Sequence, residues 1–113
     1  MHEFSLATEV IRLSQSEAEK RNAAVIREIT IEVGDLSGVE ADAFETALSL
    51  LVKDSPLENA LLNIIKIPGE GHCNTCDMAF PMQHRMASCP QCKCFPSTIS
   101  GGEEFRVVSL LID

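Results

Sequence analysis

Four cysteines constrain this chain more than any other feature, because they form two C-x-x-C pairs with twelve residues between them. The pairs are Cys73 with Cys76 and Cys89 with Cys92. Each pair places two thiols in one tight turn, and two such turns that face each other complete a tetrahedral cage of sulfur atoms. The spacing therefore predicts a closed, structural Zn²⁺ site with no open position for chemistry.

Three other uses of these cysteines are two disulfides, a redox C-x-x-C motif and an iron–sulfur site. The chain begins Met1-His2-Glu3 instead of with a basic region and an apolar stretch, so we expect a cytoplasmic, reducing setting that disfavours disulfides. A redox motif needs only one C-x-x-C pair, whereas this chain has two. An iron–sulfur site is the main alternative to zinc.

The charge and composition restrict what such a module can bind. The formal net charge is −8, and the chain has no Trp and no Tyr. Nucleic-acid binding needs a basic face and stacking aromatic side chains, so we expect no nucleic-acid partner. No apolar run approaches the roughly 20 residues of a membrane span, so we expect no membrane insertion. A hydrolytic zinc enzyme would need an open coordination position and a general base. Because no H-E-x-x-H motif is present, we expect no enzymatic activity.

The first three residues form a second candidate metal site. The free amine of Met1, the His2 imidazole and the intervening backbone nitrogens can converge on one ion. Nitrogen donors in a plane favour Ni²⁺ or Cu²⁺. Glu3 can add an oxygen ligand or accept a hydrogen bond beside the metal. The alternative is a solvated chain end that binds nothing.

Hydrophobic periodicity predicts two amphipathic helices. The first covers residues 4–22, and its stripe is Phe4, Ala7, Val10, Ile11 and Ala18, widened by Leu6 and Leu13. Ser37 and Glu40 form an S-x-x-E capping box that predicts the start of the second helix. The apolar residues that follow it at helical spacing are Phe44, Ala47, Leu48 and Leu51.

Three segments have strand patterns. Residues 25–33 alternate apolar and polar side chains, residues 61–67 form a short run rich in isoleucine, and residues 105–112 are apolar on both faces. A strand that is apolar on both faces belongs inside a sheet and not at its edge. We therefore expect 105–112 to return to the first module, between or beside the earlier strands.

These elements predict an α+β fold, with two helices packed on a small three-stranded sheet and an inserted zinc-ribbon-like module. The expected domains are residues 1–69 plus 101–113 for the α+β domain with the N-terminal metal site, and residues 70–100 for the zinc-binding module. The module has no core of its own apart from Phe80, Met82, Met86 and Phe95, so we expect its metal to hold it together.

Four stretches together resemble the HypA/HybF family of hydrogenase maturation nickel chaperones. They are MHEFSLA at the start, IEVGDLSGVEADAF in the middle, the CNTC and CPQC pair, and ISGGEEFRVVSL at the end. They appear in family order and with family spacing over essentially all 113 residues. The combination is far more specific than any one stretch.

The resemblance implies a nickel metallochaperone that delivers Ni²⁺ to the large-subunit precursor of a NiFe hydrogenase. It implies that His2 is the nickel ligand, with Glu3 beside it, and that the four paired cysteines hold a structural zinc ion. The partners it implies are the maturation GTPase HypB, the hydrogenase precursor and, in some members, urease maturation proteins. The oligomeric state stays open, and a homodimer is one alternative.

Some residues depart from the family pattern or have two uses. Glu40 takes the place of an acidic residue near the nickel end of the family, but capping the second helix is an equally good use for it. Lys93 stands where the family commonly has glycine, and Gly38 stands where many members have cysteine.

Three further side chains are potential metal ligands in or near the cysteine module. Cys94 is an additional thiol close to Cys92, which leaves a choice for the fourth zinc ligand; the turn geometry of C-P-Q-C favours Cys92. His72 and His84 are candidates for substitute ligands or for a secondary metal surface. Because four thiolates already fill a tetrahedron, solvated neighbours of the zinc site are the more ordinary interpretation of both histidines.

Overall fold

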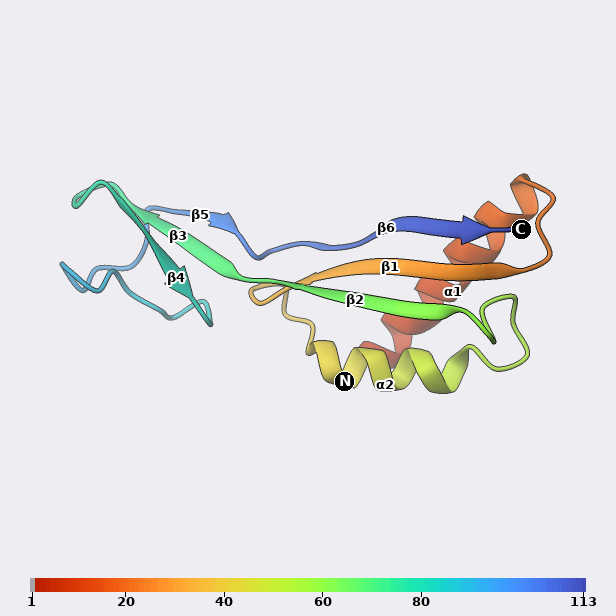
Figure 1. Ribbon diagram of the computed structural model, residues 1–113. Helices are drawn as coiled ribbons and strands as arrows, with labels where there is room; N and C mark the ends of the chain where they lie inside the picture. The colour runs from red at the N-terminus through yellow and green to blue at the C-terminus, as the bar shows by residue number, and fades with distance from the viewer. Residues whose placement is uncertain (1) are drawn as a thin grey trace. The chain divides into compact units, whose positions relative to one another are not determined.

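The computed structural model describes residues 2–113. In this range two helices and six strands follow one another (Figure 1). They are α1 Glu3–Lys20, β1 Ile26–Gly34, α2 Ala41–Leu51, β2 Leu61–Ile67, β3 Gly69–Cys73, β4 Met78–Met82, β5 Thr98–Gly101 and β6 Phe105–Ile112. The strands form two three-stranded sheets, with orders β2-β1-β6 and β4-β3-β5. The predicted α+β class is confirmed.

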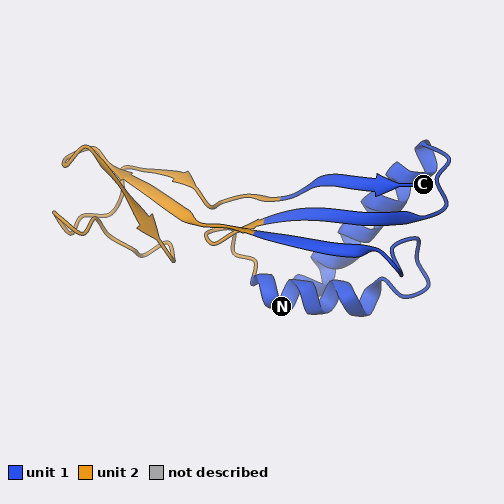
Figure 2. Cartoon of the chain, in the orientation of Figure 1, with its two compact units in different colours: residues 1–32, 40–65, 106–113 blue, residues 33–39, 66–105 orange. Residues whose placement is uncertain are grey.

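The chain divides into two compact units (Figure 2). Unit 1 comprises the chain up to Glu32, Glu40–Ile65 and Arg106–Asp113, and unit 2 comprises Val33–Val39 and Lys66–Phe105. Residues 33–39 group with the cysteine module in this division. The domain boundaries expected from the sequence, 1–69 plus 101–113 and 70–100, stay a prediction.

Helix α1 buries most of the predicted stripe. Ala7, Val10, Ile11 and Ala18 are buried, but Phe4 and Leu13 are 54% and 50% exposed, so their assignment to the buried stripe was wrong. On a helix of 3.6 residues per turn, Ser14 falls near the centre of the stripe and Leu13 beyond its margin. The small polar residue is therefore buried, while the larger apolar neighbour faces outward.

Helix α2 begins differently from the predicted capping box. The N-cap is Glu40, whose Oε1 accepts a hydrogen bond from the Asp42 N–H at 3.0 Å. Ser37 lies further upstream, and its Oγ accepts from the Val39 N–H at 3.1 Å. The expected capping role of Glu40 is thus confirmed, while the pairing of Ser37 with Glu40 was wrong. An S-x-x-E pattern cannot reveal which of its two residues caps the helix.

Strand β6 returns beside β1, as expected, but it lies at the edge of the sheet. The order β2-β1-β6 places it outermost, and Val108 and Leu111 are 42% and 55% exposed. The prediction that this strand lies inside the sheet was therefore wrong. An apolar pattern on both faces describes the side chains of a strand. It does not show whether a neighbouring strand pairs with each of its edges.

Unit 2 is built around β3, which pairs antiparallel with both β4 and β5. Its buried cluster is Leu36, Cys73, Phe80, Met82 and Cys89. Met86 and Phe95, expected in this core, are 70% and 63% exposed, so that expectation was wrong. Leu36 takes part in this core instead. Its N–H donates to the Gly102 carbonyl at 2.7 Å, and this bond holds the 33–39 segment against the module.

Within residues 2–113, no helix is both long enough and apolar enough to cross a membrane.

Candidate metal centres

The two C-x-x-C segments form similar turns in unit 2. Cys73 is the last residue of β3, and its turn ends at Cys76; the second turn runs from Cys89 to Cys92. The residue after each turn has a left-handed backbone, with φ 51° at Asp77 and 66° at Lys93. In the second turn the Lys93 N–H donates to the Cys89 carbonyl at 2.8 Å. The Cys89 N–H donates in turn to the Cys94 carbonyl at 2.8 Å, so the chain doubles back across this turn.

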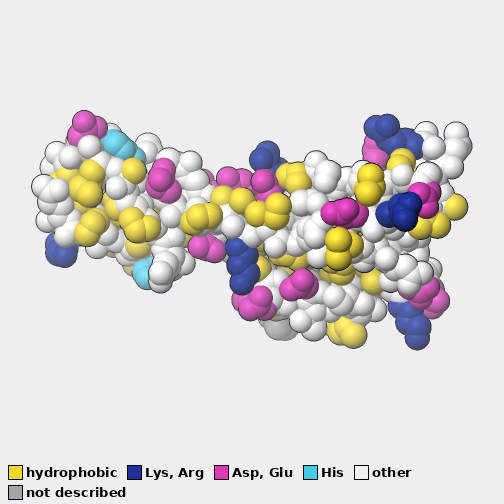
Figure 3. Space-filling view, in the orientation of Figure 1, with side chains coloured by type: hydrophobic (Ala, Val, Ile, Leu, Met, Phe, Trp, Pro, Cys, Tyr) yellow, Lys and Arg dark blue, Asp and Glu magenta, His cyan; other side chains and the backbone are white. Residues whose placement is uncertain are grey.

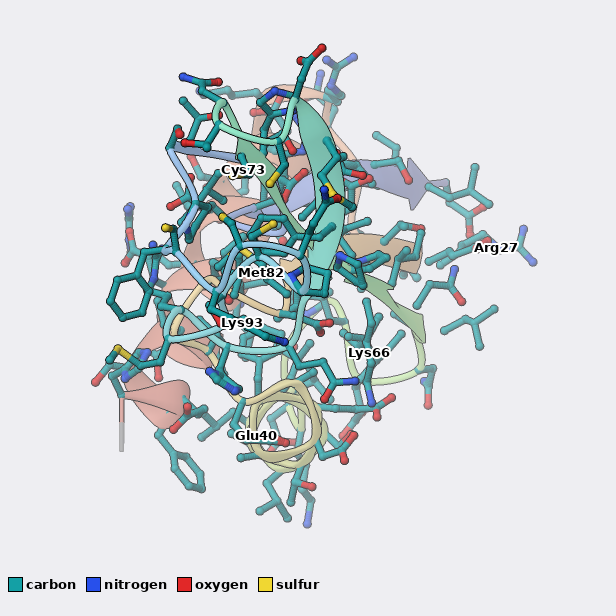
Figure 4. The ribbon with its side chains drawn as sticks, turned by 90° about the vertical axis from the view of Figure 1, so that its left-hand side faces the viewer. Arg27, Glu40, Lys66, Cys73, Met82 and Lys93 are labelled. Atoms are coloured by element: carbon teal, nitrogen blue, oxygen red, sulfur yellow. The ribbon has the colours of Figure 1, made fainter. Side chains whose placement is uncertain are left out.

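The four thiols of these turns converge on one point. Their Sγ atoms all lie within 4.8 Å of one another, and Cys73 Sγ lies 3.5 Å from Cys92 Sγ. A tetrahedral ion with sulfur at about 2.3 Å needs sulfur atoms about 3.8 Å apart. Cys73 and Cys89 are buried, whereas Cys76 and Cys92 are half-buried. Figure 4 shows the Cys73 side chain with further sulfur atoms near it. The arrangement can hold one metal ion.

The four thiols have different local environments, and the differences in their pKa values favour metal binding. The backbone N–H groups of Cys92 and Gln91 donate to the Cys89 sulfur and lower the pKa of that thiol to about 7. Burial, followed by hydrogen bonds from the other three cysteines, raises the pKa of Cys76 to about 12. A bound cation removes this conflict, because it makes all four thiolates favourable at once.

The other candidate ligands of the module lie outside this group. Cys94 is exposed, and its Sγ contacts the Cys92 carbonyl at 3.8 Å. The His72 Nε2 lies 3.5 Å from Asp77 Oδ1, and the His84 Nδ1 accepts a hydrogen bond from the Met86 N–H at 3.2 Å. The geometry thus gathers Cys92 instead of Cys94 with the other three cysteines.

The second candidate site lies at the start of α1 in unit 1. His2 is exposed and is the N-cap residue of α1, but its side chain makes no capping hydrogen bond. Its carbonyl accepts from the Leu6 N–H at 2.9 Å, which joins the residue to the helix. The Met1 amine, another of the expected ligand groups, lies outside the described residues.

Glu3 is held against α2. It is only 8% exposed, and its Oε2 accepts a hydrogen bond from the Glu40 N–H at 3.3 Å. Glu40 therefore lies beside the N-terminal site through its backbone, while its carboxylate caps α2. Sequence reasoning named both residues but missed the bond between them. The 36 intervening residues give no signal of it, although an acidic residue within the first apolar turn was a hint that Glu3 has a buried partner.

Comparison with known proteins decides the family. Residues 1–112 match a family model described as "Hydrogenase/urease nickel incorporation, metallochaperone, hypA". The chain belongs to the HypA family. The HypA proteins to which it is similar include "Hydrogenase maturation factor HypA" of Parabacteroides distasonis, at 40% identity over 99% of this chain and 97% of the relative. The factor of the same name from Geobacter metallireducens is 35% identical over the full length of both chains.

A solved HypA structure has the same fold. The solution structure of the nickel metallochaperone HypA from Helicobacter pylori aligns with a TM-score of 0.66 at 26% identity. The alignment covers 99% of this chain and 97% of that one. The resemblance to HypA/HybF is confirmed, and with it the association of this family with nickel incorporation and hydrogenase maturation. HypA proteins are described as metallochaperones.

Proposed function

We propose that this protein carries Ni²⁺ on its N-terminal residues and delivers it to the large-subunit precursor of a NiFe hydrogenase. The observation that carries the proposal is the position of His2 in a HypA-family chain. Its imidazole is exposed and takes no part in capping α1, so it is available to a metal. Together with the Met1 amine and backbone nitrogens, it supplies the donors that Ni²⁺ prefers.

Glu3 supports the nickel site. Its carboxylate accepts from the N–H of Glu40, the N-cap residue of α2, so the negative charge of the residue after His2 is already ordered before an ion binds. This charge attracts a cation, and one carboxylate oxygen can serve as a ligand. An ion held at an exposed chain end is accessible to an incoming acceptor, which suits transfer better than a closed cage does.

The four-cysteine group takes the structural role. Cys73, Cys76, Cys89 and Cys92 bind one Zn²⁺ in this proposal, because four thiolates fill its tetrahedral coordination and leave no open position. Zinc then stabilises unit 2 and has no catalytic part. An iron centre held by the same thiols is the alternative, and metal analysis of the purified protein distinguishes iron from zinc.

The partners follow from the family. We assign the GTPase HypB and the hydrogenase large-subunit precursor as docking partners in the cytoplasm, and urease maturation proteins as further clients in organisms that make urease. The chain's net charge of −8 disfavours nucleic acid as a partner. Delivery requires no reaction at a catalytic residue, so the protein acts as a carrier and not as an enzyme.

The test is made in cells that contain the protein with His2→Ala at limiting nickel. We expect unprocessed large subunit without nickel, and partial recovery of hydrogenase activity when nickel is added to the medium. His84→Ala is the matched control, because it removes another exposed imidazole. Full hydrogenase activity from His2→Ala at limiting nickel, or equal loss from both variants, would overturn the carrier mechanism.

A further inference from the structure

Unit 2 leaves two large apolar side chains in contact with solvent. Met86 is 70% exposed and Phe95 is 63% exposed, although the sequence predicted both in the core of this unit. Among residues 66–105, all of which the structure describes, these are the large hydrophobic side chains that remain exposed. A small unit with few apolar side chains would be more stable with both of them inside. Their exposure therefore indicates a surface that binds another molecule.

Both side chains border one pocket, whose volume is about 430 Å³. Arg85 and Met86 line it from one segment and residues 95–99 from another, so no carboxylate lines it. The second segment is held in place, because the Ser97 N–H donates to the His72 carbonyl on β3 at 2.8 Å. Figure 3 shows hydrophobic side chains gathered on the visible face of unit 2. A pocket whose wall is already ordered costs little entropy to fill.

The pocket borders the open edge of a sheet. Thr98 and Ile99 line it, and they belong to β5, which is outermost in the order β4-β3-β5. The other edge strand, β4, contains Pro81, a residue that protects sheet edges, whereas β5 contains neither proline nor a charged residue. An extended segment can therefore add to β5 through main-chain hydrogen bonds and place a side chain in the pocket. Because β5 has only 4 residues, that segment is short.

The charges of this surface favour an acidic segment. No Asp or Glu occurs between Asp77 and Glu103, although the chain has 17 acidic residues and a net charge of −8. Within this stretch Arg85 is already paired with Glu103 Oε2 at 2.8 Å. The zinc–thiolate group is itself negative, but two of its four cysteines are buried, which leaves Lys93 as the unpaired side-chain charge of the stretch. Lys93 lies two residues before Phe95, so their Cα atoms are within about 7 Å of each other. Carboxylates are repelled by most of this chain but meet a cation here.

We propose that this surface docks a short extended segment of a partner protein, in which one large apolar side chain is flanked by carboxylates. The backbone of the segment pairs with β5, its apolar side chain fills the pocket beside Met86 and Phe95, and a carboxylate lies toward Lys93. The flat ring of phenylalanine supplies rigid contact area, while the flexible methionine adapts to the shape of the incoming side chain. The surface uses none of the proposed nickel ligands, so docking does not require that the chain carries nickel.

The experiment selects short random peptides on the zinc-loaded full chain and then measures the affinity of the enriched peptide by fluorescence anisotropy. We expect a consensus of one large apolar residue between acidic residues. Phe95→Ser should weaken binding by about tenfold or more, as for an anchor at an interface, while Leu50→Ser, which removes a side chain that is 64% exposed on α2, should not. Lys93→Glu should also weaken it, and this loss should shrink at high salt. No enriched peptide, a consensus without acidic or apolar residues, or equal binding by Phe95→Ser and wild type overturns the proposal.

Amide chemical shifts of the wild-type chain keep the proposal testable if Phe95→Ser loses its zinc. Addition of the enriched peptide should shift the resonances of Met86 and of residues 93–101 and leave those of α1 and α2 unchanged. Shifts confined to unit 1 overturn the proposal. So do the same shifts on concentration of the chain without peptide, because a second copy would then cover the surface. His2→Ala should bind the peptide as the wild type does, so failure of the nickel proposal and failure of this one are distinguishable.

Discussion

The two units of this chain bury their interiors by different means. Unit 1 packs two helices with a sheet, and most of its buried residues are aliphatic or aromatic, such as Ile29, Phe44 and Leu48. In unit 2, two of the five residues of the buried cluster, Cys73 and Cys89, are cysteines of the candidate metal site. A small unit with so few apolar side chains cannot offset the entropy of folding by burial alone. Unit 1 is therefore expected to fold without metal, and unit 2 to need it.

The two candidate metal sites also differ, in how far each is enclosed by the protein. Two of the four thiols are buried and two are half-buried, and four thiolates can fill a tetrahedral coordination, so an ion held there would exchange slowly. His2 is exposed at the start of α1, and the buried face of this helix is formed mainly by apolar side chains such as Val10 and Ile11. In the proposed function the chain releases nickel and retains zinc, and this separation of the two sites would let nickel leave without a change in the fold.

The largest expected effect comes from Cys73→Ala. Structural zinc contributes roughly 10–16 kcal/mol of apparent binding free energy in small zinc domains, so we expect loss of zinc and unfolding of unit 2. Amide hydrogen exchange should show protection lost in residues 66–105 and kept in α1 and α2. Cys94→Ser is the control and should keep its zinc, since Cys94 lies outside the four-thiol group. Protection of unit 2 without metal would contradict the difference between the units.

The second prediction concerns His2→Ala in the purified protein. We expect nickel binding to be lost, zinc content to stay unchanged, and the free energy of unfolding to change by no more than about 0.5 kcal/mol, as for other exposed side chains. Calorimetric titration with Ni²⁺ and thermal melting measure the two quantities. One residue added before Met1 should weaken nickel binding in the same way, while a C-terminal tag should not. Unchanged nickel affinity in both altered proteins would remove the contrast between the sites.

Much of this comparison could be predicted from the sequence, because local patterns determine it. The convergence of the four thiols depends on turns of a few residues, which the cysteine spacing indicates. The helix α1 and the strand β1 are indicated by hydrophobic periodicity, which reflects the buried face of each element. The return of β6 to the first sheet was predicted, but its position at the edge was not, since the composition of a strand does not reveal how many neighbours it has. The burial of Leu36 in unit 2 was missed for the same reason, because it depends on backbone bonds to a residue 66 positions later, Gly102.

The third prediction separates the charge of Glu3 from its hydrogen bond. Glu3→Ala removes the acceptor of the Glu40 N–H, so the free energy of unfolding should fall by about 0.5–1.5 kcal/mol, the usual net contribution of one hydrogen bond. Glu3→Gln keeps an oxygen that can accept the bond, so its stability should lie close to that of the wild type, while nickel affinity falls with the lost charge. Chemical denaturation and Ni²⁺ titration distinguish the two effects. Wild-type nickel affinity in Glu3→Gln would show that the carboxylate only positions the chain.

The smallest effect is expected from Lys93→Gly in the second cysteine turn. Lys93 has φ 66°, a left-handed conformation that costs a non-glycine residue about 1–2 kcal/mol. Glycine relieves this strain but loses about 0.5–1 kcal/mol through its greater freedom in the unfolded chain. The net gain should be about 0.5–1 kcal/mol, and it should appear in unit 2 alone. Lys93 is exposed, so the change removes no buried contact.

The equivalent residue of the first turn provides the control. Asp77 has φ 51°, but aspartate tolerates this region better than lysine does, because its short side chain can hydrogen-bond locally. Asp77→Gly should therefore stabilise unit 2 by less than Lys93→Gly. Zinc-loaded variants are compared by hydrogen exchange in each unit, since a melting curve for the whole chain would mix the two. If both glycines gave the same gain, or if the gain extended to α1 and α2, backbone strain in the second turn would not be its cause.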